Sequence, residues 1–245
     1  MHQGKKVSLI LPAYNEEPHI RRAVEDFKNT RIFDEILVID NNSKDRTAEF
    51  AKQAGATVIR ETKQGLGNAV HRGLAEATGE IVVLAEPDGT FVANDIHKFL
   101  AYADDFDVVI GTRTAKELIW SGANMGFFLR WGNVAVAKML EFLFSGSCLT
   151  DCGCTFRLIR RSALERIKPF FSVGASHCLP EITILAFLSG SRVIEIPINY
   201  KERVGVSKIT GSWKGTFKTG MNMIGLILWY RLRTLFCGLD FKTGK

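Results

Sequence analysis

The sequence predicts an α/β fold in which a mostly parallel β-sheet is covered by helices on both faces. Three observations lead to this prediction. Short apolar runs alternate with amphipathic helical stretches along the first half of the chain. The apolar runs are continuous, which is typical of strands that are buried on both faces. No linker, internal repeat or low-complexity stretch divides the 245 residues, so we expect a single domain.

The elements of the first half begin and end at recognisable signals. Pro12 follows the first apolar run, while Gly55 and Gly79 follow the second and third helical stretches. In the first helical stretch, Ile20 and Phe27 fall on one face. The pattern predicts strands over residues 7–11, 35–39, 57–59, 80–85 and 107–111, and helices over 17–27, 46–54 and 67–77.

The second half of the chain is less regular. Residues 131–144 and 181–188 have the composition of helices, and residues 192–200 read as a strand. This last strand contains Pro197, which cannot donate a hydrogen bond to a neighbouring strand. We therefore expect it at the edge of the sheet.

Composition and charge limit the classes of protein to which this chain can belong. A chain that is 46% hydrophobic and 24% charged is neither disordered nor fibrous. The net charge of +6 is concentrated in residues 200–245, which contain nine basic and two acidic side chains. Such a tail suggests an anionic partner: nucleic acid, a phosphate-bearing ligand or a membrane surface. The longest uncharged runs are too short to span a bilayer.

Cysteine and histidine offer no metal site. The five cysteines are an odd number in a chain without the pattern of a secretion signal, so reduced thiols in the cytoplasm are expected. Cys148, Cys152 and Cys154 lack the spacing of a zinc site, and the five histidines show no ligand spacing.

Carboxylates follow several of the predicted strands. Glu86 and Asp88 come directly after one apolar run, and Asp40 follows another. Ligands of parallel sheets bind beyond the carboxyl ends of the strands. Two carboxylates on one turn can offer oxygens to Mg²⁺ or Mn²⁺, which often share their ligands with a substrate phosphate. An isolated pair of this kind is more often a solvated turn, but its position beside a second acidic strand end favours a metal and a nucleotide.

An ordered series of motifs resembles family 2 glycosyltransferases of the GT-A fold. In chain order these are "VSLILPAYNEE", "ILVIDNNSKDRT" and "GLGNAVHRGLAEATGEIVVLAEPDGTF". The later motifs "VVIGTR", "RWGN", "DCGCTFRLIRR", "PEI" and "IEIPINYKERVGVSKI" resemble the dolichyl- or polyprenyl-phosphate mannosyltransferase branch. The resemblance implies a GT-A, Rossmann-like domain, which we expect over residues 1–212. Residues 213–245 are expected to form a basic amphipathic helical segment.

The resemblance also implies a donor site. The nucleoside would lie against Pro12, Tyr14, Glu16 and Asp40, and the donor phosphate or sugar near Gly65, Gly67 and Arg72. Glu86, Asp88 and Thr90 occupy the metal motif, where Mg²⁺ or Mn²⁺ would bind. The family more often has Asp in the place of Glu86 and Gln in the place of Thr90, which leaves metal affinity and donor choice open.

For the acceptor, the resemblance implies a set of cations. Arg113 and Arg130 would hold the acceptor phosphate, together with Arg157, Arg203 and Lys208. Asp151 would lie near the reacting centre, which makes Asp88, Arg113, Arg130 and Asp151 the expected catalytic residues. Glu181 matches an acidic position of the family that orients its neighbours or sugar hydroxyls.

The C-terminal segment allows two interpretations. Apolar residues recur at helical spacing from Phe217 to Leu235, with Trp229, Tyr230 and flanking cations. Periodicity alone favours a core helix, whereas interfacial aromatics and cations are typical of a helix that lies in the membrane surface. With a lipid-phosphate acceptor implied, we expect peripheral association with the cytoplasmic face of a membrane. A small membrane-anchor subunit is an optional partner.

The expected activity is the inverting transfer of a sugar, with mannose from GDP-mannose favoured, onto a polyprenyl or dolichyl phosphate. The acceptor phosphate is already anionic, so positioning and charge stabilisation would suffice without a strong base. One alternative is a UDP-sugar, carrying glucose or N-acetylhexosamine, with another lipid or glycan acceptor. A second alternative is a nucleotide-sugar-binding subunit with weak catalysis. Nucleic acid is not expected as a partner.

Overall fold

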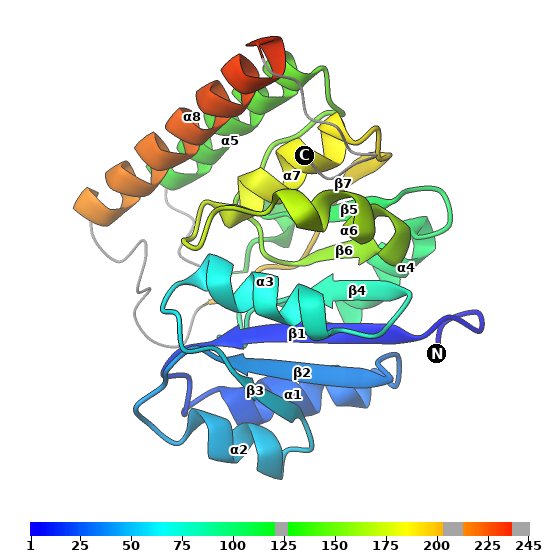
Figure 1. The fold of residues 1–245 in the computed structure, drawn as a ribbon. Helices are drawn as coiled ribbons and strands as arrows, with labels where there is room; N and C mark the ends of the chain where they lie inside the picture. Colours follow the sequence, from blue (N-terminus) through cyan, green and yellow to red (C-terminus); the bar gives the residue numbers. More distant parts are fainter. Residues whose placement is uncertain (121–126, 203–212, 237–245) are drawn as a thin grey trace.

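A computed structural model describes residues 1–120, 127–202 and 213–236, which form a β-sheet between two layers of helices (Figure 1). The strands are β1 (Val7–Ala13), β2 (Glu35–Asp40), β3 (Thr57–Arg60), β4 (Ile81–Leu84), β5 (Val108–Thr112), β6 (Arg157–Arg160) and β7 (Val193–Pro197). They lie in the order β3-β2-β1-β4-β6-β5-β7. All pair in parallel except β6, which is antiparallel to both of its neighbours. The predicted mostly parallel α/β sheet is confirmed.

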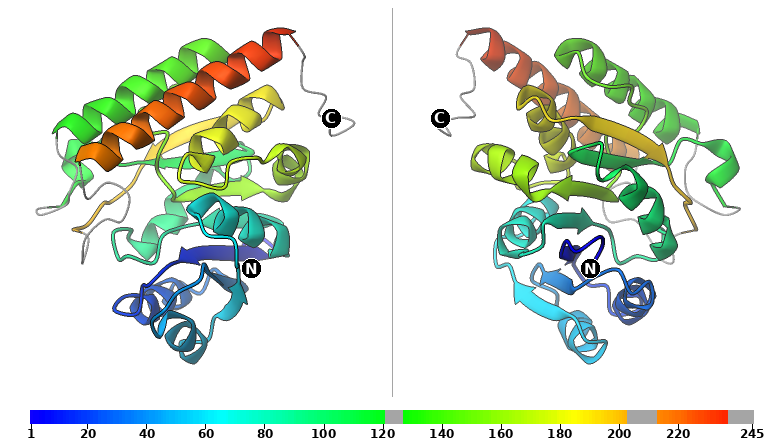
Figure 2. Two further views of the ribbon diagram at one scale, coloured as in Figure 1. Left: turned by 60° about the vertical axis from the view of Figure 1, so that its left-hand side comes forward. Right: turned by 90° about the vertical axis from the view of Figure 1, so that its right-hand side faces the viewer.

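The helices cover both faces of the sheet (Figure 2). They are α1 (Ile20–Asn29), α2 (Thr47–Gln53), α3 (Leu66–Glu76), α4 (Ile96–Tyr102), α5 (Phe127–Phe144), α6 (Arg161–Ile167), α7 (Cys178–Leu188) and α8 (Trp213–Phe236). Helices α1, α2 and α4 share one apolar core with one face of the sheet. Helices α3, α5, α6, α7 and α8 share the other. Successive residues of β1 illustrate the division, because Leu9 and Leu11 enter the first core and Ile10 the second.

Two strands differ instructively from the sequence pattern. β1 continues through Pro12 to Ala13 because its pairing with β4 ends at Ile10, so that the missing amide of Pro12 breaks no ladder. β6 is not predicted, since arginines at both of its ends interrupt the apolar run. The placement of β7 at the edge of the sheet is confirmed.

Helix α8 packs on the rest of the fold and also presents apolar side chains to the outside. Met223, Ile227 and Tyr230 are buried in the core that α8 shares with α5 and α7. The two helices α5 and α8 lie side by side (Figures 1 and 2). No helix within the described ranges has the length and apolar character needed to cross a membrane. The exposed apolar side chains of α8 are Phe217, Met221, Leu228, Trp229, Leu232, Leu235 and Phe236.

Candidate active site

Four of the predicted site residues lie at one edge of the sheet. The carboxyl ends of β1, β2, β4 and β5 all point to this edge, because these strands run in one direction. Tyr14, Asp40, Glu86 and Arg113 lie at or just beyond those four ends. The topology therefore brings together groups that are up to a hundred residues apart in the chain.

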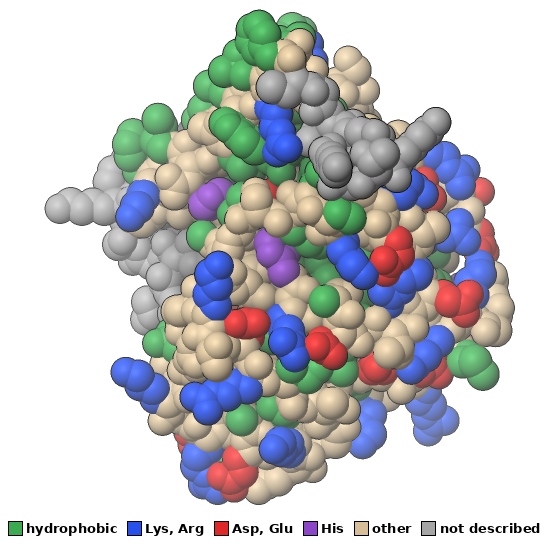
Figure 3. All heavy atoms as spheres, in the orientation of Figure 1, with side chains coloured by type: hydrophobic (Ala, Val, Ile, Leu, Met, Phe, Trp, Pro, Cys, Tyr) green, Lys and Arg blue, Asp and Glu red, His purple; other side chains and the backbone are tan. Residues whose placement is uncertain are grey.

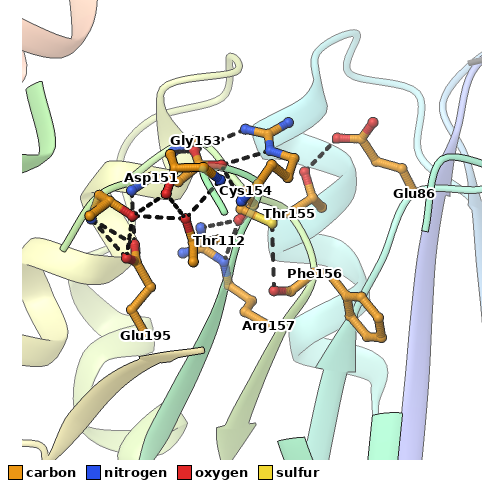
Figure 4. A network of polar contacts seen from close by, with 12 residues as sticks. Glu86, Thr112, Asp151, Gly153, Cys154, Thr155, Phe156, Arg157 and Glu195 are labelled. Atoms are coloured by element: carbon orange, nitrogen blue, oxygen red, sulfur yellow. Dashed lines mark hydrogen bonds and ion pairs between the residues drawn. The ribbon is translucent and has the colours of Figure 1, made fainter. Parts of the chain in front are cut away.

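The acidic turn after β4 is held by threonines. Asp88 is 2% exposed, and its Oδ1 accepts hydrogen bonds from the Thr90 amide at 3.1 Å and the Thr90 hydroxyl at 2.6 Å. Glu86 accepts a hydrogen bond from the hydroxyl of Thr155, which lies two residues before β6 in the chain (Figure 4). Both carboxylates are thus oriented by neutral donors. Thr90, predicted as a metal ligand, acts here on Asp88.

Tyr200 connects the acidic turn to Arg113. The backbone around it is tied to the turn by a bridge between Phe91 and Tyr200 and by the Lys201 amide, which donates to the Thr90 carbonyl at 2.8 Å. The Arg113 guanidinium lies 5.5 Å from the centre of the Tyr200 ring. Burial raises the pKa of Tyr200, opposed by Arg113 and reinforced by Asp88 and Glu86. Tyr200 therefore contacts Arg113 through its ring, while its backbone is tied to the acidic turn.

Arg113 and Asp151 form a buried ion pair. Arg113 Nε donates to Asp151 Oδ2 at 2.7 Å, and Nη2 donates to Oδ1 at 2.9 Å. Asp151 is fully buried and also accepts from the amides of Arg113 and Gly153. Burial acts to lower the pKa of Arg113, but Asp151 outweighs it and the pKa lies well above the ordinary value. The pair fixes a permanent cation at the edge of the sheet.

Glu195 of β7 stabilises the loop that carries Asp151, the partner of Arg113. The Glu195 carboxylate accepts from the Thr150 amide, the Thr150 hydroxyl at 2.6 Å and the Asp151 amide at 2.8 Å (Figure 4). Burial raises the pKa of Glu195, and the hydrogen bonds from Thr150 oppose the rise. Glu195 is not among the predicted site residues, although a single acid inside the apolar strand 192–200 is a signal that points to it. Thr155 and Tyr200, inside quoted motifs, were likewise missed.

Arg157 lies away from the surface of the site. Its side chain is fully buried and donates to the carbonyl of Cys154 and, at 2.9 Å, to the carbonyl of Leu179. Burial lowers its pKa. Where the sequence predicts a contact to the acceptor phosphate, the guanidinium instead ties β6 to α7 through backbone oxygens.

Asp40 and Asn41 shape the end of β2. Asp40 is 7% exposed and accepts from the Ser43 amide at 3.2 Å. Asn41 donates to the Lys63 carbonyl at 2.8 Å and accepts from the Gly65 amide at 2.8 Å. Asn41, which the sequence analysis did not select, therefore ties the loop before α3 to the strand end. Its place next to Asp40 was the available signal.

Gly65 and Gly67 face a neighbouring segment, residues 172–175. The Asn68 amide donates to the Gly174 carbonyl at 3.2 Å. A β-carbon at Gly67 would lie 2.0 Å from the Val173 carbonyl oxygen, and one at Gly65 would lie 2.2 Å from that of Gly174. The glycines thus allow two backbones to approach closely.

The remaining predicted residues differ in their burial and in their partners. Pro12 is buried in β1, and Tyr14 and Glu16 are half-buried beyond its end. Arg72 pairs with Glu76 at 2.9 Å on the exposed face of α3. Arg130 is half-buried in the first turn of α5. Arg203 and Lys208 lie outside the described residues.

Comparisons with known proteins agree on a family. Residues 8–168 match the family described as Glycosyl transferase family 2. A dolichyl-phosphate hexose transferase of Haloferax volcanii is 32% identical over 231 residues, which cover 93% of this chain and 96% of that protein. An uncharacterized glycosyltransferase of Mycobacterium tuberculosis is 32% identical over 219 residues, 87% of this chain and 94% of that one.

Solved structures share the fold. The glucosyl-3-phosphoglycerate synthase of M. tuberculosis, in complex with Mn²⁺, UDP and glucosyl-3-phosphoglycerate, aligns with a TM-score of 0.71 and 18% identity. The alignment covers 93% of this chain and 80% of that chain. The match of more than half of the chain to the family, together with a relative of nearly equal length, shows that this protein is a glycosyltransferase of family 2.

Proposed function

We propose that the protein transfers a hexose from a nucleoside-diphosphate sugar to a polyprenyl or dolichyl phosphate. The observation that carries this proposal is the 32% identity to a dolichyl-phosphate hexose transferase along almost the whole of both chains. Arg113, held as a cation at the edge of the sheet, suits a phosphate acceptor. Inversion at the anomeric carbon remains part of the proposal.

The donor is the first open choice. We favour GDP-mannose, because the motifs resemble the mannosyltransferase branch. UDP-glucose is the competing donor, and the structures of glucosyl-3-phosphoglycerate synthase with UDP-glucose support it. Asp40 and Tyr14, at neighbouring strand ends, are the residues we propose to contact the nucleoside. Gly65, at the N-cap of α3, and Arg72, in the middle of that helix, would lie on the phosphate side.

The acidic turn after β4 fits a divalent cation. Glu86 and Asp88 supply hard oxygen donors that Thr155 and Thr90 already orient. Within the described ranges, no group of three or more His, Cys, Asp or Glu side chains could hold a metal. Two carboxylates would therefore bind Mg²⁺ or Mn²⁺ together with the donor diphosphate. The bound cation would neutralise the charge that develops on the leaving diphosphate.

The acceptor phosphate would bind at Arg113. Asp151 holds the Arg113 side chain in one orientation through two hydrogen bonds, and Glu195 holds the backbone of Asp151. Arg130 is proposed as a second contact, and Arg203 and Lys208 remain predictions from the sequence. We leave Arg157 out of the proposed acceptor set, because its guanidinium is engaged with buried carbonyls. The phosphate itself is the nucleophile, so these residues position it and no base is needed.

The exposed apolar side chains of α8, from Phe217 to Phe236, form an outer apolar face. We propose that this face contacts the membrane. Figure 3 shows apolar side chains gathered where α5 and α8 lie. On α8, the exposed Trp229 and Leu232 lie near cations, and the Arg233 guanidinium lies 5.2 Å from the Trp229 ring. Aromatic side chains with basic neighbours are typical of helices at a membrane surface. The cytoplasmic leaflet is the proposed face, and a separate anchor subunit is not required by the proposal.

One assay tests the function. The purified chain is incubated with a short polyprenyl phosphate, Mg²⁺ or Mn²⁺, and GDP-mannose, UDP-glucose or UDP-N-acetylglucosamine in separate reactions. We expect a glycolipid, detected by mass spectrometry, with one donor and only with metal. Sugar transfer that ignores the polyprenyl phosphate would favour the alternative acceptor, and an absence of any transfer would favour the binding subunit. Full activity of Asp88→Asn with normal metal dependence would overturn the metal assignment.

A further inference from the structure

Glu181 lies at the centre of a buried network that the catalytic proposal does not use. Its carboxylate is fully buried in α7 and accepts hydrogen bonds from the amide and hydroxyl of Ser172 and, at 3.1 Å, from the Val173 amide. A further hydrogen bond comes from the hydroxyl of Tyr230 in α8 at 3.0 Å. A buried carboxylate depends on such donors, because each one that is lost leaves part of its charge without compensation.

The segment that Glu181 holds is the one that packs on the start of α3. The Gly174 carbonyl accepts from the Asn68 amide, and the Val173 carbonyl occupies the space beside Gly67. On the same side, the His71 ring stacks on Phe171 with 4.7 Å between ring centres. The position of residues 172–174 therefore determines where the N-terminus of α3 lies.

Tyr230 belongs to the helix with the outer apolar face. It is fully buried, whereas its neighbour Trp229 is 47% exposed and contacts the Tyr230 ring edge-on at 4.8 Å between centres. A shift of α8 against the body of the protein would thus reach the Glu181 carboxylate directly. Packing alone would transmit such a shift less specifically, because apolar contacts have no preferred direction.

We propose that Tyr230 is a positioning residue that, through Glu181 and residues 172–174, couples the placement of α8 to the donor side of the site. This inference rests on the proposed function in two respects, namely that Gly65 and Gly67 lie beside the donor diphosphate and that α8 contacts the membrane. Contact of α8 with a lipid surface then favours the arrangement of α3 that binds the donor. Tyr230 itself touches no substrate.

The test compares Tyr230→Phe with a control on the same helix. Tyr230→Phe keeps the ring and removes the hydroxyl, which donates to Glu181 at 3.0 Å and, at 3.5 Å, to the Phe170 carbonyl. Ile227→Val, almost one turn earlier and equally buried, removes one methyl group and no hydrogen bond. GDP and UDP, each with Mn²⁺, are titrated into both variants and the wild type, with and without vesicles of phosphatidylcholine and phosphatidylglycerol. Donor KM and kcat are measured in parallel.

For Tyr230→Phe we expect nucleotide affinity to fall about 5–30-fold, donor KM to rise by a similar factor, and kcat to change little. Vesicles should tighten nucleotide binding to the wild type and to Ile227→Val but not to Tyr230→Phe, although all three bind the vesicles equally. Equal nucleotide affinity of Tyr230→Phe and the wild type would overturn the inference, as would an equal loss in Ile227→Val. A wild type that binds nucleotide but makes no glycolipid would refute the proposed function alone, since the binding comparison would still decide this inference.

Discussion

Gly67→Ala tests how closely α3 and residues 172–175 must approach. Gly67 lies in the first turn of α3, and its α-carbon faces the backbone of the neighbouring segment. The added carbon would lie 2.0 Å from the Val173 carbonyl oxygen and 2.9 Å from that of Ala175. Both atoms belong to the backbone, so no side-chain rotation can relieve the overlap.

The size of the effect follows from these distances. Carbon and oxygen atoms approach to about 3.3–3.6 Å in close contacts, so the segment must move by roughly 1.3 Å or more. Forcing extra volume into a packed site costs about 1–3 kcal/mol. Alanine also favours a helix over glycine by about 1 kcal/mol, which acts in the opposite direction.

Gly225→Ala isolates the helix propensity. Gly225 lies on the exposed side of α8, and a β-carbon there meets no atom within 4 Å. The difference in stability between the two variants therefore measures the overlap at Gly67. For a chain of this size we expect the Tm of Gly67→Ala to lie roughly 2–12 °C below that of Gly225→Ala in thermal unfolding followed by circular dichroism. Equal melting temperatures would refute the close approach of the two backbones.

Three further predictions concern the edge of the sheet. Thr155→Val removes the donor to Glu86, and we expect metal-dependent transfer to fall about 10–100-fold, recovered in part at high Mn²⁺ in a titration of activity. Asp151→Ala leaves Arg113 without its buried partner and should lower the free energy of unfolding by about 3–5 kcal/mol in urea, and a loss below 1 kcal/mol would contradict the pairing. Burial raises the pKa of the Glu195 carboxyl above 4.5, so between the unfolded and the folded pKa the folded protein binds a proton that the unfolded chain has lost. The stability that this proton contributes is present at low pH and is lost as pH rises through the folded pKa. The Tm advantage of the wild type over Glu195→Gln should therefore shrink as pH rises from about 4.5, and a constant difference would argue against it.

Most of the fold could be predicted because its signals are local. Continuous apolar runs marked β1, β2, β4 and β5, and Pro197 marked β7 as an edge strand. β6 was not predicted, because its arginines resemble solvent-exposed residues until the partners of Arg157 are known. A charge inside a strand is compatible with burial only where distant carbonyls receive it.

The candidate site was predicted less evenly. Asp40, Glu86, Asp88 and Arg113 follow strands, so the parallel sheet alone places them at one edge. Glu195 could not be assigned to this edge, because it acts on Thr150 and Asp151, more than forty residues earlier. A contact of this kind depends on how β7 pairs with β5, and nothing in the local pattern encodes that pairing.

The sequence by itself determined the class of fold, the edge at which polar groups gather and the family, because periodicity and motif order are properties of neighbouring residues. Only the tertiary structure decided that Arg113 is presented at the edge while Arg157 is buried, although both are arginines in motifs of the same family. It also decided that Tyr230 of α8 meets Glu181 of α7. The physical reason is that burial and hydrogen-bond partners are set by elements packed together from distant parts of the chain, and these determine what a charged side chain can do.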